Sequence, residues 1–205
     1  MDEDKVVEIL KENLRFSDNS IKKIKKFYVY LLEYNKRYNL ISKNTVNSIW
    51  FRHILDSAQI VNFIDFKKDL KIADFGSGAG FPGLIIALYN ENPDFHVKLY
   101  EKSPVKRAFL KNIKKYLNLE NVSISDNVYD EKISTDIVIC RAFKKLEEIF
   151  KISREIVKKP HKIIILKGKN AQSEINKVSL GSNYSYKLKS SITDDDSKII
   201  IIEAK

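Results

Sequence analysis

A glycine-rich turn between two apolar runs constrains the fold more than any other feature of this sequence. The stretch IADFGSGAGFPGLIIAL covers residues 72–88 and contains four glycines and one proline. Its apolar start predicts a short strand, and its apolar end predicts a helix whose first turn accommodates Pro82. Glycines allow a sharp turn and let a ligand approach the backbone without a Cβ in the way. Strand, glycine turn and helix in this order form the context of a nucleotide-binding loop.

The glycines fit two patterns, and each pattern predicts a different cofactor. Residues 78–83 match the G-x-G-x-x-G of a dinucleotide site, in which the helix N-terminus holds a pyrophosphate. Residues 74–80 match the acidic-x-G-x-G-x-G turn of an S-adenosylmethionine (SAM) site. SAM has no phosphate, and Asp74 is a suitable partner for the ammonium group of its methionine end. The alternative is that Asp74 is a buried residue that caps the turn or the helix.

Glu101 supports a nucleoside ligand without choosing between the two cofactors. It lies at the end of the next predicted strand, 21 residues beyond Gly80. A carboxylate at that position accepts hydrogen bonds from ribose hydroxyls in either cofactor class. The alternative is an exposed glutamate at a strand end.

Strand-like and helix-like patterns alternate from residue 71 onward. Five strands are predicted over residues 71–75, 97–101, 122–125, 136–140 and 162–167, with helices beginning near Pro82, Pro104, Val128, Lys144 and Asn170. Two further strands, 184–189 and 198–203, follow with no helix between them. This order predicts an α/β fold with a Rossmann-like sheet whose ligands lie at the carboxyl ends of the strands. Seven strands that end in a hairpin are typical of a SAM-dependent methyltransferase sheet and not of a nicotinamide-binding one.

The first 60 residues have a different pattern, which is helical. Two apolar stripes run through residues 6–14 and 21–34, and the SDNS stretch at residues 17–20 supplies cap residues between them. We therefore predict an N-terminal helical cap over residues 1–65 and a SAM-binding methyltransferase domain over residues 66–205. We expect the two parts to form one compact unit, because 205 residues supply one sizeable core.

Composition indicates a basic, cytoplasmic protein and excludes several site types. The formal charge of +10 is typical of a protein that binds a polyanion such as nucleic acid. The alternative is a lysine-rich coding bias, since only six of the 37 basic residues are arginine. Cys140 is the only cysteine and the three histidines lack ligand spacing, so we expect no disulfide and no metal. The N-terminus does not resemble a secretory signal, and no apolar run approaches the ~20 residues of a membrane span. A monomer is the default expectation.

Six short motifs together resemble one enzyme family. RHILDS (52–57), GSGAGFPG (76–83) and EKSPVKRAFL (101–110) resemble the small-subunit rRNA guanine-N7 methyltransferase family called RsmG or GidB, and YNL (38–40), CRA (140–142) and LKG (166–168) match it in the same order. The resemblance covers nearly the whole chain. It implies SAM as the cofactor, 16S rRNA or the small ribosomal subunit as the partner, and transfer of a methyl group to N7 of a specific guanine.

The resemblance also implies a set of cofactor contacts. SAM is expected over Gly76 and Gly78, with Phe81 in contact and the ribose near Glu101. The backbone at Val128 and Tyr129 is expected along the adenine, and Arg141 at the mouth of the pocket, facing substrate. The family often has an acidic residue where Tyr129 stands and a serine where Cys140 stands, so only a backbone contact is expected at Tyr129.

Substrate contacts are expected from the cap and from the residues that follow Glu101. RHILDS presents Arg52, His53 and Asp56 on a helix beside the cofactor mouth, where the alternative is a His–Asp pair that fixes the cap to the sheet. Asn39 is either a substrate hydrogen-bonding residue or a helix-end residue. Lys106 and Arg107 offer a basic edge for RNA phosphates.

The implied reaction needs placement more than proton transfer. The lone pair of guanine N7 is free at neutral pH, so no general base is expected. We therefore assign Arg141, His53 and Arg52 to placing the substrate, with a structural ion pair as the alternative for Arg141. Cys140 lies in the apolar run 137–140 and is predicted to be a strand residue.

Two other functions remain open on the sequence. A nicotinamide-dependent oxidoreductase would use residues 78–83, although little of the chain is left for a substrate domain. A non-catalytic RNA-binding module would retain the fold without the reaction, although the intact glycine turn and Glu101 argue against it.

Overall fold

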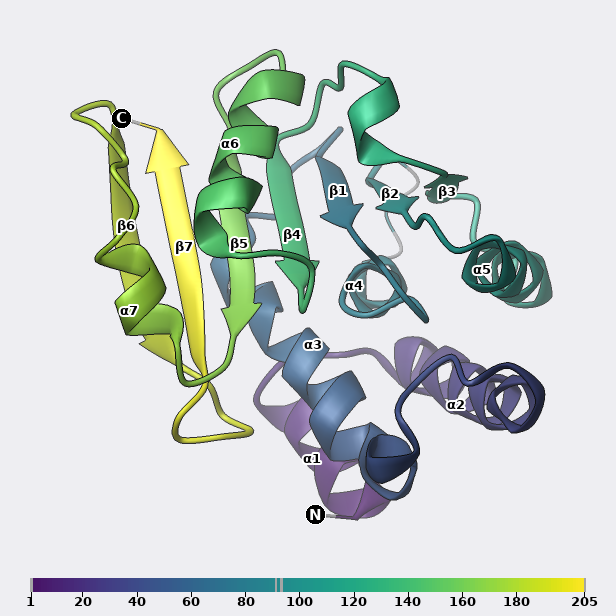
Figure 1. Cartoon of the computed structure of the whole chain (residues 1–205). Helices are drawn as coiled ribbons and strands as arrows, with labels where there is room; N and C mark the ends of the chain where they lie inside the picture. The colour runs from purple at the N-terminus through teal and green to yellow at the C-terminus, as the bar shows by residue number, and fades with distance from the viewer. Residues whose placement is uncertain (1, 91, 93, 205) are drawn as a thin grey trace.

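Seven strands form a single sheet in the order β3-β2-β1-β4-β5-β7-β6 in this computed structural model, which describes residues 2–90, 92 and 94–204 (Figure 1). The first five are parallel, and β7 runs antiparallel between β5 and β6. The predicted Rossmann-like methyltransferase sheet with its final hairpin is therefore confirmed. The strands are β1 Lys71–Phe75, β2 His96–Tyr100, β3 Val122–Ser125, β4 Ile137–Arg141, β5 Lys162–Lys167, β6 Tyr184–Ser190 and β7 Lys198–Ala204.

Helices form the N-terminal part, as the apolar stripes predict. Ser17 caps the second helix, because its hydroxyl accepts a hydrogen bond from the Ser20 N–H at 3.0 Å. That helix ends at Asn39, whose φ of +44° is the left-handed conformation common after a helix. The elements are α1 Glu3–Glu12, α2 Asp18–Tyr38, the 3-10 helix η1 Lys43–Ser48, the π-helix η2 Trp50–Leu55, α3 Asp56–Ala58 and the 3-10 helix η3 Gln59–Phe63.

The helices between the strands include one wrong prediction. The helix expected from Val128 is a single 3-10 turn, η4 Val128–Asp130. The buried apolar residues of this segment, Val128 and Ile133, are five positions apart and do not share a helix face, and Ile133 instead bridges to Val157. The remaining helices are α4 Gly83–Tyr89, α5 Pro104–Tyr116, α6 Leu146–Ile156 and α7 Ala171–Ile175.

Alternate residues of the strands pack on opposite faces of the sheet. Ile137 and Ile139 of β4 belong to a core shared with the N-terminal helices, α4 and α5, whereas Val138 and Cys140 pack with α6 and α7. Cys140 is fully buried, as expected of a strand residue, and burial raises the pKa of its thiol. Because the N-terminal helices contribute to the same core as the sheet, the two parts pack together, and the boundary after residue 65 stays a prediction.

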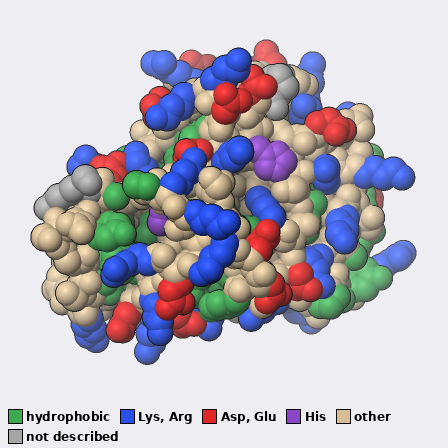
Figure 2. Space-filling model, turned by 90° about the horizontal axis from the view of Figure 1, so that it is seen from above, with side chains coloured by type: hydrophobic (Ala, Val, Ile, Leu, Met, Phe, Trp, Pro, Cys, Tyr) green, Lys and Arg blue, Asp and Glu red, His purple; other side chains and the backbone are tan. Residues whose placement is uncertain are grey.

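The N-terminal helices lie below the carboxyl ends of the parallel strands in Figure 1. Any ligand held at those strand ends therefore lies between the sheet and the cap. Figure 2 shows the opposite end of the molecule, where acidic side chains are interspersed among the basic ones. Within the described residues, no helix is both long and apolar enough to cross a bilayer.

Candidate cofactor and substrate site

The glycine turn is held against the end of the neighbouring strand. The N–H groups of Gly76 and Ser77 both donate to the Tyr100 carbonyl at 2.9 Å. The next N–H, that of Gly78, donates to Oε2 of Glu101 at 2.8 Å, and Ser103 donates its N–H to Oε1 at 2.7 Å. A carboxylate oxygen has two lone-pair sites, so each oxygen of Glu101 keeps one for a ligand hydroxyl.

Two glycines of the turn are required for different reasons. At Gly76, with φ of +76°, a Cβ would lie 2.5 Å from Cδ2 of Phe143, so the ring of Phe143 occupies the space that a side chain would need. At Gly78, with φ of +58°, a Cβ would meet nothing within 4 Å. The space above Gly78 is therefore open, as a ligand that lies on the backbone requires.

A hollow of about 380 Å³ lies over the turn, within the usual size range of small-molecule sites. Phe81 and Glu101 line it from the sheet side, and the cap closes it with His53. Glu101 and the open Gly78 fit a nucleoside with free ribose hydroxyls. The lining residues are Leu40, Ile41, His53, Gly76, Ser77, Gly78, Ala79, Phe81, Glu101, Lys102, Lys106, Arg141, Ala142 and Phe143.

Asp74 does not reach this hollow. Its side chain is fully buried, and Oδ2 accepts a hydrogen bond from the Gly83 N–H at 2.9 Å. Burial raises the pKa of Asp74 to about 7, against the lowering effect of that hydrogen bond. This bond to the first residue of α4 is the one that the capping alternative states, and the contact with the ammonium group of SAM stays a prediction.

Arg141, at the end of β4, joins the sheet to the cap. Its Nη1 donates to the Arg52 carbonyl at 2.8 Å and to Oδ2 of Asp56 at 3.0 Å, and its Nη2 lies 2.7 Å from Nδ1 of His53. The guanidinium also lies 5.3 Å from the centre of the Phe81 ring. Three of its five N–H donors are used in these bonds, so two remain for a ligand. Arg141 thus forms the structural ion pair that the alternative states, with Asp56, and it also lines the hollow.

His53 is a neutral acceptor toward Arg141. An arginine has only donors, so Nδ1 of His53 carries no proton and Nε2–H donates to Oγ1 of Thr45, 2.9 Å away. The hydroxyl of Thr45 in turn donates to the Ser42 carbonyl. Burial, followed by the charges of Arg141 and Arg52, lowers the pKa of His53 to about 3. His53 therefore positions Arg141 and has no free basic nitrogen.

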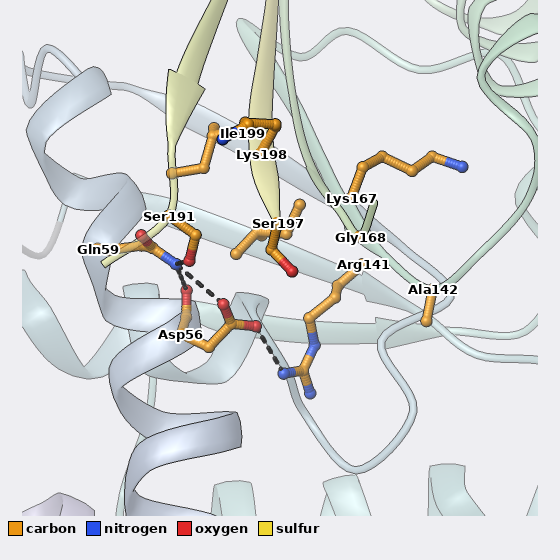
Figure 3. Close-up of a pocket in the computed structure, with 11 residues that line it drawn as sticks. Asp56, Gln59, Arg141, Ala142, Lys167, Gly168, Ser191, Ser197, Lys198 and Ile199 are labelled. Carbon is orange, nitrogen blue, oxygen red and sulfur yellow. Dashed lines mark hydrogen bonds and ion pairs between the residues drawn. The ribbon is translucent and has the colours of Figure 1, made fainter. Parts of the chain in front are cut away.

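Asp56 connects the cap to the C-terminal hairpin as well as to β4. Its Oδ1 accepts a hydrogen bond from Nε2 of Gln59 at 2.9 Å, and its Oδ2 accepts one from Arg141 (Figure 3). Oδ1 also accepts a hydrogen bond from Oγ1 of Thr193 at 2.9 Å. His53 and Asp56 thus meet at Arg141 and form no His–Asp pair. A second hollow of about 180 Å³ lies on this side of Arg141 and is lined in part by the LKG stretch, residues 166–168.

One nitrogen of Arg107 is engaged in bonds within the protein. Its Nη1 donates to the carbonyls of Glu101 and Lys102 at 2.9 and 2.6 Å and pairs with Oδ1 of Asp126 at 2.6 Å. These bonds give the guanidinium a structural role through Nη1, and the phosphate contact of Arg107 stays a prediction. Lys106 does line the hollow, and its ammonium forms no ion pair with any described residue.

Other predicted contacts lie outside the hollow or at its edge. Val128 is buried in the core, and Tyr129 is exposed beside the ammonium of Lys102, so neither lines the hollow. Asn39 is exposed at the end of α2, next to Leu40 and Ile41, which do line it. The side chain of Arg52 is exposed, and only its carbonyl contacts Arg141.

Several residues of the site lie outside the assigned set. The sequence favours an apolar core role for Phe143 over stacking on the guanine, and its ring packs against Gly76 and lines the hollow. Ala142 has a φ of +51°, a strained value for a residue other than glycine and one that occurs at functional sites. Thr45 and Thr193 complete the network around Arg141, but their spacing carries no local signal. Among the described residues, no three groups of the metal-ligating types come together.

The neutral His53 predicts a pH dependence of stability. Its pKa is lower in the folded than in the unfolded chain, so its contribution is fully present above pH ~6.5 and decreases as the pH falls toward about 3. We expect the free energy of unfolding of the wild type, relative to a His53→Gln variant, to fall by up to ~1.4 kcal/mol per pH unit below pH ~6.5. Urea denaturation at several pH values measures this difference, and a constant difference would contradict the assigned pKa.

Comparison with known proteins identifies the family. The model of the family "GidB: rRNA small subunit methyltransferase G" matches residues 20–198. The Ribosomal RNA small subunit methyltransferase G of Orientia tsutsugamushi (strain Ikeda) is 36% identical over 97% of this chain and 98% of its own length. That of Pelagibacter ubique is 34% identical over 86% of this chain and 85% of its own length.

Solved structures agree on the fold. A SAM dependent methyltransferase from Aquifex aeolicus superimposes with a TM-score of 0.61 at 10% identity, over 83% of this chain and 97% of its own. Because the family model covers residues 78–83, the dinucleotide interpretation of these residues is set aside in favour of the methyltransferase turn. With a family model that spans both the cap and the sheet, the chain belongs to the rRNA small subunit methyltransferase G family.

Proposed function

We propose that this chain transfers a methyl group from SAM to N7 of a guanine in 16S rRNA. The observation that carries the proposal is the open backbone at Gly78, bound to Glu101 on the floor of a hollow that the cap closes. The names of the relatives support small-subunit rRNA as the substrate. The choice of guanine N7 rests on the motif resemblance. We further propose that the protein acts as a cytoplasmic monomer.

Residues around the hollow fit the ribose and the apolar surface of SAM. Glu101 has one free lone-pair site on each oxygen for the ribose hydroxyls, and the open backbone at Gly78 lets the ligand lie close. Phe81 offers an apolar wall. When bound, SAM supplies a methyl group carried on a cationic sulfur.

The chain contributes placement to this reaction and no base. His53 is neutral, and both ring nitrogens are engaged, so it takes no proton from the substrate. Guanine N7 needs no deprotonation, and holding two reactants in attack geometry contributes up to ~7–11 kcal/mol. Arg141 has two N–H donors left at the rim of the hollow, which suit guanine O6 or a phosphate. An arginine against N7 itself would oppose the positive charge that develops there.

Cofactor choice and methyl transfer test the proposal together. Calorimetry is expected to show binding of SAM and none of NAD. Incubation of unmethylated small-subunit rRNA with radiolabelled SAM is expected to label the RNA only when the protein is present. Preferential binding of NAD, or unlabelled RNA, would contradict the proposal.

Arg52 separates substrate binding from cofactor binding. Its side chain is exposed at the cap, whereas its carbonyl holds Arg141 through the backbone, which survives substitution. We expect Arg52→Ala to retain the SAM affinity of the wild type and to lower methylation of rRNA about 10-fold or more, as loss of a charge-assisted hydrogen bond does. Calorimetry and the labelling assay measure the two effects, and loss of SAM binding would contradict the role assigned to the cap.

A further inference from the structure

A row of lysine and tyrosine side chains runs along α2, away from the hollow. Lys22, Lys26, Tyr30, Tyr34 and Tyr38 follow one another at intervals of four residues, which places them on one ridge of the helix. The ridge is about 24 Å long, at 1.5 Å per residue. It begins beside the hollow, because Leu40 and Ile41, just beyond Tyr38, line it.

Four tyrosine rings form a continuous column across α2 and α5. Tyr34 and Tyr30 stack at 4.9 Å between ring centres, and Tyr30 stacks on Tyr116 of α5 at 5.2 Å. Tyr38 lies 5.8 Å from Tyr34 at the end nearer the hollow. The two end residues, Tyr38 and Tyr116, are 49% and 56% exposed, so each leaves ring surface open to a further flat group.

A basic groove lies at the far end of this column. Its volume is about 550 Å³, and Tyr116 lines it together with lysines of α2. None of its described lining residues is acidic. Of its lysines, Lys25 pairs with Glu3, while Lys22, Lys23 and Lys26 form no ion pair among the described residues. The carboxylate that acts on Lys22 is that of Asp18, one turn earlier on α2, and it pairs with Lys11. The end of the molecule seen in Figure 2 differs, because acidic and basic side chains alternate there.

Unpaired lysines beside open aromatic rings are the combination that binds single-stranded nucleic acid. The ammonium groups contact phosphates, and the rings stack on bases without selecting their sequence. An anionic membrane would use the lysines but not an ordered column of rings. We propose that the α2–α5 ridge, defined here as Lys22, Lys26, Tyr30, Tyr34, Tyr38 and Tyr116, binds an unpaired segment of the substrate RNA outside the hollow. This rests on the proposed function for the identity of the RNA.

Two variants test the charge and the stacking separately. The first is Lys22→Glu with Lys26→Glu, and the second is Tyr116→Ala. Each variant has a matched control away from the ridge. For the charge variant the control is Lys151→Glu, on α6, with Lys158→Glu, just after α6. For Tyr116→Ala it is Tyr186→Ala on β6, whose ring is 46% exposed. Calorimetry with SAM checks that each variant is folded, since none of these residues lines the hollow.

Binding of a fluorescein-labelled single-stranded oligouridylate is measured by anisotropy at several salt concentrations. Each lost phosphate contact lowers the affinity for RNA about 4-fold at 0.15 M salt, so the charge variant is expected to bind about 15-fold more weakly. The slope of log affinity against log salt concentration is expected to be smaller by ~1.4. The Tyr116→Ala variant is expected to bind the oligouridylate about 5-fold more weakly, or weaker still. In rRNA methylation, both variants should raise KM and leave kcat unchanged.

The outcomes separate this inference from the proposed function. The ridge does not bind RNA if both ridge variants keep wild-type affinity and KM, or if the controls lose as much affinity as the variants. Binding of phosphatidylserine vesicles in place of RNA would also contradict the inference. If the wild type binds RNA through the ridge but labels no rRNA with SAM, the proposed function fails and the ridge stands as an RNA-binding surface.

Discussion

Replacing Gly78 with valine is expected to lower the affinity for SAM at least 100-fold while leaving the chain folded. The Cβ at this position enters open space above the turn and meets no protein atom within 4 Å, so the added side chain takes the volume that the ligand needs. The positive φ of +58° adds a strain of about 1–2 kcal/mol. Calorimetry with SAM measures the affinity, and urea denaturation measures the stability.

Gly181 provides a matched control for this substitution. It has a φ of +74°, and its Cβ also meets nothing within 4 Å, but it lies between α7 and β6 and does not line the hollow. Gly181→Val should therefore lose similar stability and retain SAM binding. Equal loss of SAM affinity in the two variants, or none in Gly78→Val, would show that the cofactor does not lie over the turn.

Replacing Arg141 with alanine is expected to lower the free energy of unfolding by about 3 kcal/mol and methyl transfer more than 10-fold. The side chains of Arg141 and Asp56 are each 17% exposed, so removal of the guanidinium leaves a largely buried carboxylate without its cation. It also removes the donors to His53 and to the Arg52 carbonyl. Urea denaturation and the labelling assay measure the two losses.

Arg154 is a suitable comparison for Arg141. Its guanidinium lies 5.5 Å from the Phe150 ring and 5.8 Å from the Tyr184 ring on the other face of the sheet, and the structure gives it no ion pair within the described residues. Arg154→Ala is expected to cost no more than about 1 kcal/mol, with methylation unchanged. If Arg141→Ala were equally mild, the network between sheet and cap would not hold the two together.

Most of the fold follows from sequence periodicity. The seven strands begin and end within one residue of their predicted positions, because buried β-branched runs such as those of β4, β5 and β7 alternate with clear turn and cap residues. The segment after β3 is the exception. Its two buried residues, Val128 and Ile133, are held by the core and by the bridge to Val157, which a local pattern does not encode.

The candidate site is predicted less completely, because charge pairing is decided by tertiary contacts. Of the residues that the motifs indicate, Gly76, Gly78, Phe81 and Glu101 line the hollow. The motifs do not distinguish a carboxylate that faces the ligand from one that caps a helix, and in the structure Asp74 accepts a hydrogen bond from the first residue of α4. The partner of Asp56 on the hairpin, Thr193, is 137 residues away in sequence, so no spacing rule connects them.

The most direct test of the central claim is nucleoside mass spectrometry of the RNA product. Unmethylated 16S rRNA or small subunits are incubated with the protein and with SAM that carries a deuterated methyl group, and the RNA is then digested to nucleosides. The expected result is deuterated 7-methylguanosine at one position, absent with the Gly78→Val variant and present with Gly181→Val. Deuterium in another nucleoside, or in none, would contradict the assignment of this protein as a guanine-N7 methyltransferase of small-subunit rRNA.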